Sequence, residues 1–125
     1  MNKSIVGLVV IAWMFGTHAL AGDVAKGEAL AKTKCAMCHD LTNGKKNKLG
    51  PYLWDIMGQP AGKVSGFKYS AALMEKAASI TWDEATMSKY VEGPKDFIPG
   101  GKMLFPGLKD AAGRDDVISF LKTLK

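Results

Sequence analysis

The chain has 125 residues, of which 47% are hydrophobic and 23% are charged, a composition typical of one globular domain with one core. Its net charge of +5 is spread along the chain, and no basic run alternates with aromatic residues. This pattern excludes a nucleic-acid-binding protein and is compatible with acidic protein partners.

The first 21 residues have the pattern of a cleavable signal peptide. Lys3 provides a positive start, residues 5–15 form an apolar run, and residues 19–21, Ala-Leu-Ala, form a small-residue cleavage site. We therefore expect a mature protein of residues 22–125, with a net charge of +4 after the loss of Lys3, in a bacterial periplasm. Retention of the segment as a membrane anchor is the alternative, but the apolar run is short for a membrane span.

Residues 23–34 predict a first helix. Asp23 can cap its N-terminus, and Val24, Leu30 and several alanines lie on one side. Gly27 lowers the stability of a helix, so we interpret it as a point of close approach to another helix.

Residues 40–66 predict a long irregular stretch with little periodicity. The turn signals in it are Asn43-Gly44, Gly50-Pro51, Gln59-Pro60, Gly62 and Gly66. A loop of this length in a small domain loses conformational entropy, which must be offset by something that the loop surrounds. A buried cofactor would provide this.

The second half of the chain predicts further helices. Residues 71–77 and 82–92 favour short helices, the second ended by the Gly-Pro pair at 93–94, and residues 97–101 predict an irregular stretch. An amphipathic helix that packs on the first helix is predicted by the spacing of Val117, Phe120, Leu121 and Leu124. No segment alternates as a strand does, so the sequence predicts an all-α fold with long loops.

The segment Cys35-Ala36-Met37-Cys38-His39 predicts one covalently bound haem c with its iron. The thiols of Cys35 and Cys38 would add across the two haem vinyl groups, and His39 would be the proximal nitrogen ligand. A disulfide or redox-active dithiol and a zinc site are the alternatives. A thioredoxin-type dithiol needs a βαβ setting and zinc needs a fourth ligand, and the sequence indicates neither.

The second axial ligand must be methionine, lysine, water or absent, because His39 is the only histidine after residue 21. The candidate methionines are Met37, Met57, Met74, Met87 and Met103. Met37 is fixed on the proximal side by the attachment turn, and Met57 lies among loop apolar residues. Met74 and Met87 lie on expected helices, where methionine usually fills the core. Met103 lies in an irregular segment that can aim a thioether at a metal, so we predict that it is the ligand. Packing on the haem face without ligation is the alternative.

With this motif near the N-terminus and Ile98-Pro99-Gly100-Gly101-Lys102-Met103 late in the chain, the sequence resembles class I cytochrome c, in its mitochondrial and bacterial c2-like branch. The resemblance covers residues 22–125. It includes Gly22–Gly27, Gly50-Pro51, Gly66–Tyr69, Trp82, Tyr90, Gly93–Lys95 and Arg114. It implies a small single-domain cytochrome c fold, in which the N- and C-terminal helices cross and short helices and long loops surround one haem.

The resemblance also implies roles for residues around the haem. The carbonyl oxygen of Pro51 would accept a hydrogen bond from the proximal histidine. Tyr69 and Trp82 would donate hydrogen bonds to a haem propionate, Tyr90 would lie near the sulfur of the second ligand, and Phe105 would shield the exposed haem edge. Ordinary core packing is the alternative for each aromatic residue.

Three positions depart from the family pattern. Gln59 stands where the family usually has arginine, Leu73 where it has asparagine, and Gly101 where it has threonine. We therefore expect fewer hydrogen bonds in the distal pocket and a more loosely held loop around Met103.

The implied function is electron transfer without catalysis. An iron with His and Met ligands has no free site for a substrate, and the same ligands hold both oxidation states. The chain would be a monomeric carrier in a respiratory or photosynthetic chain, meeting a cytochrome bc complex, terminal oxidase, reaction centre or periplasmic dehydrogenase in a peripheral encounter at the membrane. The carrier would be steered toward acidic patches on these partners by Lys34, Lys48, Lys95, Lys102 and Lys109. An enzyme or gas-binding haem protein is the competing class, and it would require Met103 to be absent from the iron.

Overall fold

The computed structural model describes residue 11 and residues 21–125. The expected signal peptide lies almost entirely outside these residues, so its presence and its cleavage stay predictions. No helix within the described residues is long and apolar enough to cross a membrane.

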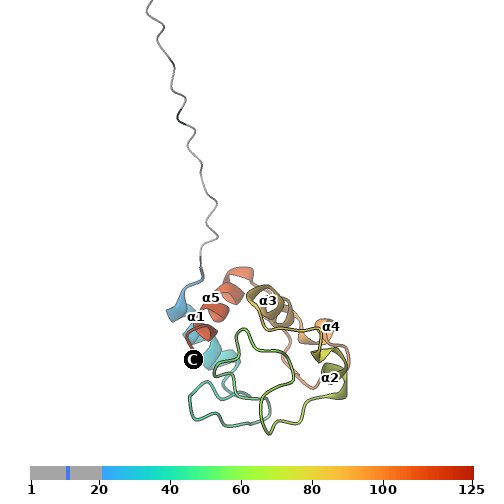
Figure 1. The fold of residues 1–125 in the computed structure, drawn as a ribbon. Coiled ribbons are helices and arrows are strands. Elements are labelled where there is room, and N and C mark those ends of the chain that lie inside the picture. The colour runs from blue at the N-terminus through green and yellow to red at the C-terminus, as the bar shows by residue number, and fades with distance from the viewer. Residues whose placement is uncertain (1–10, 12–20) are drawn as a thin grey trace, which may run out of the picture.

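The described residues form a helical fold with long loops, which confirms the all-α prediction. The helices are α1 (Val24–Lys34), α2 (Ala71–Ala77), α3 (Glu84–Glu92), α4 (Pro94–Phe97) and α5 (Ala111–Leu121). Figure 1 shows α5 against α1 on one side of the molecule, α2 and α4 on the other, and the green loops of residues 40–70 running below them. The described part of the chain contains no β-strand, and its only β-type pairing is an isolated bridge between Pro60 and Thr81.

The four longer helices begin at side-chain caps. Asp23 accepts a hydrogen bond from the N–H of Lys26 at 3.0 Å, and α1 begins at the next residue, as the sequence predicted. The caps of α2, α3 and α5 are Ser70, Asp83 and Asp110, each accepting from a backbone N–H three residues later. The cap at Asp83 explains why α3 begins at Glu84, two residues later than the expected start at residue 82.

Helix α4 was not expected. The Gly-Pro pair at 93–94 ends α3, as predicted, but Pro94 also begins a new helical turn. Proline is favoured at the first helical position, because its fixed φ suits a helix and its missing N–H would have no partner there. The irregular stretch expected at residues 97–101 therefore begins only at the end of this turn.

Helices α1 and α5 cross in close contact at Gly27. A Cβ atom on this buried glycine would overlap the backbone oxygen of Asp116 and lie 3.0 Å from the Cβ of Phe120. The backbone N–H of Asp23 donates to Asp116 Oδ1 at 2.7 Å, which ties the start of α1 to the same turn of α5. The interpretation of Gly27 as a crossing point is confirmed.

We predict that Gly27→Ala lowers the free energy of unfolding by about 1–3 kcal/mol, because the added methyl group must push two helix backbones apart. This loss would occur although alanine is the better helix former by about 1 kcal/mol. Denaturant unfolding of the haem-loaded protein, followed by far-UV circular dichroism, measures the change. Ala29→Gly, at an exposed position of the same helix, is the control for helix propensity. A stabilised Gly27→Ala protein would contradict the close crossing.

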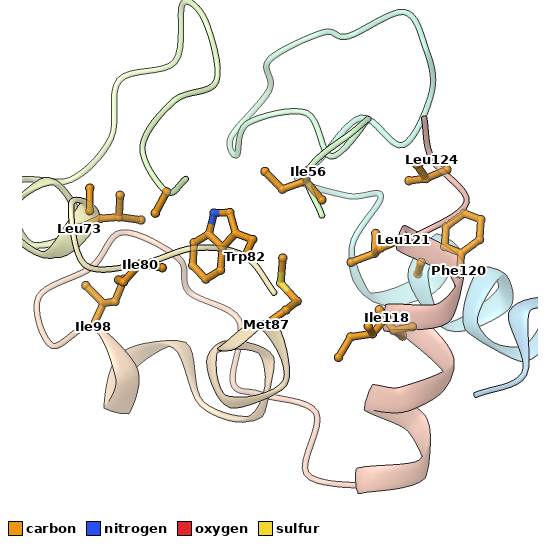
Figure 2. Close-up of a cluster of buried hydrophobic side chains, with 14 residues drawn as sticks. Ile56, Leu73, Ile80, Trp82, Met87, Ile98, Ile118, Phe120, Leu121 and Leu124 are labelled. Carbon is orange, nitrogen blue, oxygen red and sulfur yellow. The ribbon is translucent and has the colours of Figure 1, made fainter. Parts of the chain in front are cut away.

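The core is made of buried side chains from α1, α2, α3, α5 and the loops. The predicted stripe of Val117, Phe120, Leu121 and Leu124 is buried throughout. In Figure 2, Trp82 and Met87 lie between buried side chains of α5 and a second group of side chains on the α2 side of the molecule. That second group contains Leu73, Ile80 and Ile98, which are also buried.

Candidate haem site

The attachment motif forms a tight turn at the end of α1. Cys35 is the C-cap of the helix, and its carbonyl accepts hydrogen bonds from the N–H groups of Cys38 at 3.0 Å and His39 at 2.9 Å. The two thiols therefore project from one turn of chain, and both cysteines are free. This is the arrangement that attachment to two vinyl groups of one porphyrin requires.

The electrostatics of this turn argue against a redox-active dithiol. Burial, reinforced by the neighbouring thiol of Cys38, raises the pKa of Cys35 to about 11. A reactive dithiol instead has one thiol with a lowered pKa, since the thiolate is the nucleophile. Cys35 stays protonated at neutral pH and carries no charge that would hinder burial next to an apolar ring.

The His39 ring is held by the residue predicted to hold it. Its Nδ1 lies 2.6 Å from the carbonyl oxygen of Pro51 and can donate to it, which leaves Nε2 as the nitrogen available to iron. Burial lowers the pKa of His39 below its usual value and outweighs the opposing effect of the hydrogen bond to Pro51. The imidazole is therefore neutral, the form that binds a metal.

Gly50 is a site residue that the sequence analysis recognised as part of a turn and of the family pattern, without a role at the haem. A Cβ atom at this buried position would overlap the His39 ring, and the Gly50 N–H donates to the carbonyl of Cys38 at 2.8 Å. The imidazole thus lies flat against bare backbone. The Gly-Pro pair was the available signal, but nothing in the sequence shows which ring the glycine meets.

The four predicted aromatic residues lie at different depths. The Tyr69 hydroxyl accepts the N–H of Val64 at 2.9 Å, so its own hydrogen remains free to donate, and burial raises its pKa. Trp82 is buried and its ring centroid lies 4.9 Å from that of Tyr90, whose pKa burial raises to about 12. Phe105 is half-buried. Core packing is therefore present at Trp82 and Tyr90, and the haem contacts of all four stay predictions.

The methionines separate by exposure. Met87 is buried in the core, as expected, but the expectation that Met74 fills the core is wrong, because its side chain is 49% exposed. Helix α2 buries Leu73 and Ala77, and Met74 lies off this i, i+4 stripe. Of the three methionines outside helices in residues 21–125, Met37 is strongly exposed, whereas Met57 and Met103 are half-buried.

The positions that depart from the family pattern provide few polar groups to a pocket. The Gln59 amide donates to Asp55 Oδ2 at 3.4 Å on the surface, and Leu73 is buried with an apolar side chain. Gly101 has no side chain, and its N–H donates to the carbonyl of Ile98 at 3.0 Å.

These residues fit a haem c better than a zinc ion. One turn offers two free thiols and a neutral imidazole with one free nitrogen, and Cys35 packs against the buried hydrophobic cluster. Within residues 21–125, no three side chains of His, Cys, Asp or Glu gather as a metal ion would need, so Cys35, Cys38 and His39 do not converge as zinc ligands would.

The sequence of residues 24–125 is similar to a known protein family. A family model described as cytochrome c covers residues 24–125. Cytochrome c of Chlamydomonas reinhardtii is 46% identical over 105 residues, which are 84% of this chain and 92% of that protein. Cytochrome c of Stellaria longipes is 48% identical, and that of Cochliobolus lunatus 46%, each over 101 residues, 81% of this chain and 92% of the relative.

These relatives correct the expected location. They come from an alga, a flowering plant and a fungus, which have no periplasm, and they favour the mitochondrial side of the resemblance. The expected bacterial periplasmic location is therefore wrong, and a periplasmic dehydrogenase is no longer a candidate partner. The error has a physical origin: an apolar N-terminal run shows an affinity for membranes but does not identify the compartment beyond them.

Proposed function

Because the chain belongs to the cytochrome c family, we propose that it carries single electrons between protein partners of a respiratory or photosynthetic chain, with His39 and Met103 as the axial ligands of its iron. The family establishes the coarser facts: the chain binds one covalent haem c and is an electron-transfer protein, not an enzyme. When bound, the haem supplies a one-electron change of oxidation state.

The proposal rests on the surroundings of the two proposed ligands, His39 and Met103. His39 Nδ1 lies 2.6 Å from the carbonyl oxygen of Pro51 and the ring presents one free nitrogen, so the protein backbone itself orients the proposed proximal ligand. Met103 is half-buried in a segment without helix, where its thioether is not committed to core packing. A ligand on each face would leave no open coordination site, which suits a carrier and not a catalyst.

Spectroscopy of the ferric protein, combined with a potential titration, tests the proposal. Methionine ligation gives a weak far-red absorption band and raises the reduction potential. Absence of this band, together with carbon monoxide binding by the ferrous protein at neutral pH, would instead support an enzyme or gas-binding protein.

Five exposed lysines support docking with acidic partners. Lys48 lies against the attachment turn, with its Nζ donating to the carbonyl of Ala36 at 2.7 Å, and Lys109 donates to the carbonyl of Glu92 at 2.6 Å. Neither bond neutralises the ammonium charge. Lys34, Lys95 and Lys102 are also exposed. We propose the cytochrome bc complex, a terminal oxidase or a reaction centre as partners of a monomeric protein.

We predict that electron transfer to such a partner slows as ionic strength rises, because salt screens the attraction between the charges. Lys102→Gln should lower the rate about three- to tenfold at low ionic strength and flatten its salt dependence. Stopped-flow oxidation by a purified partner measures both. Lys122→Gln removes the same charge from a lysine paired with Glu84 at 2.7 Å and is the matched control. A rate that stays flat or rises with salt would contradict steering.

We further propose that residues 22–125 are the mature protein. Gly22 packs directly on α5, where a Cβ atom would overlap the backbone oxygen of Asp115, whereas Ala21 is exposed. This contact supports a mature protein that begins at Gly22. N-terminal sequencing of the purified protein tests this boundary.

A further inference from the structure

The loop that carries Met103 is held at its two ends. No hydrogen bond among the described residues involves residues 102–107. At the entry, the Gly101 N–H donates to the carbonyl of the buried Ile98 at 3.0 Å. At the exit, the Leu108 N–H donates to the carbonyl of Val91 at 2.9 Å. The position of the thioether therefore depends on how firmly these ends are fixed.

The exit is fixed by one side chain from α5. Arg114 Nη1 donates to the carbonyl oxygens of Leu108 at 3.0 Å and Lys109 at 2.9 Å. Its Nε donates to the hydroxyl of Ser88 on α3 at 3.0 Å, and its Nη2 lies 3.9 Å from a carboxylate oxygen of Glu92 at the end of that helix. The Arg114 side chain is 11% exposed, and its bonds to Leu108 and Ser88 are partly buried, whereas its bond to Lys109 lies at the surface.

The chain also makes a steric contact at the same place. Gly107 has a φ of 109°, a conformation that side chains disfavour, and a Cβ atom there would overlap the carbonyl oxygen of Glu92. The last residue of the loop thus passes directly over the end of α3. Arg114 joins α3 to the residues immediately after Gly107. One guanidinium thus connects α5, α3 and the end of the loop.

We propose that Arg114 is a positioning residue for Met103, a role that rests on the proposed ligation. The planar guanidinium reaches two carbonyls and a hydroxyl at once, and a lysine ammonium cannot reproduce that fork. Loss of the fork leaves the partly buried carbonyl of Leu108 without its donor, which weakens the docked loop relative to a displaced one. The polar partners of the Arg114 side chain are Ser88, Leu108, Lys109 and Glu92, so it would act on Met103 through the end of the loop.

Competition with imidazole for the sixth position of the ferric haem protein tests this role. Imidazole binds when the loop releases Met103, so its apparent affinity reports the population of the released loop. Arg114→Lys should keep the far-red band without imidazole and bind imidazole about tenfold more tightly than wild type, as expected for loss of a charged hydrogen bond. Ser88→Ala removes one of the three acceptors and should give a smaller increase.

Val117→Ala is the matched control, because this buried residue of the same helix forms no part of the exit contact. It should lower global stability in denaturant and leave the imidazole affinity unchanged. If Arg114→Lys and Val117→Ala lose the same stability and gain the same apparent affinity for imidazole, the positioning role is overturned. A wild-type protein without the far-red band would overturn the proposed ligation itself, so the two failures are distinguishable.

Discussion

Met103→Ala is expected to abolish the far-red band of the ferric protein and to open the sixth coordination position of its iron. Loss of the thioether would remove the proposed ligand, which favours the reduced form, so the reduction potential should fall by about 200 mV, within the ~0.8 V over which axial ligands set haem potentials. Alanine cannot coordinate, so the ferrous protein should bind carbon monoxide at neutral pH. Absorption spectra and a potential titration measure these changes together.

Met57→Ala is the control for this variant. Met57 is the other half-buried methionine outside a helix, and it packs against the hydrophobic core. Its truncation should lower the stability of the fold while the far-red band and the potential remain close to those of the wild type. If the band instead survives in Met103→Ala and disappears in Met57→Ala, the ligand has been assigned to the wrong methionine.

Local patterns account for the helices that sequence analysis predicted. Asp23 caps α1, and the bounds of α2 match the prediction. Of the predicted stripe, Val117, Phe120 and Leu121 are buried in α5, and Leu124 is buried just beyond its end. Each prediction depends on residues within a few positions of one another, because caps and helical periodicity act over one or two turns. Gly27 was a further success, since a glycine inside a good helix requires a reason from outside it.

The rest depended on contacts between distant segments, which short-range patterns do not report. Met74 was misplaced because its exposure depends on which side of α2 faces the core. The contact of Gly50 with His39 spans eleven positions in sequence, and the hydrogen bond from Arg114 to Ser88 spans 26. The attachment motif alone specifies the cofactor, whereas the groups that orient its ligands come together only in the folded chain.

Gly50→Ala is expected to have the largest effect among substitutions that leave every ligand in place. The new methyl group would overlap the His39 imidazole, so the ring must move away from Pro51 or the 48–51 segment must shift. We expect a loss of about 3 kcal/mol in unfolding free energy, at the upper end for overpacking, since a displaced ring also gives a poorer ligand. Denaturant unfolding measures this loss, and pyridine haemochrome analysis should show less haem per chain. Gly44→Ala, in the exposed part of the same loop, adds the same methyl group 3.1 Å from the Thr42 hydroxyl oxygen, which lies at the surface, and should change both quantities much less. Equal behaviour of the two variants would mean that the ring has room to spare, and that the glycine serves the turn and not the ligand.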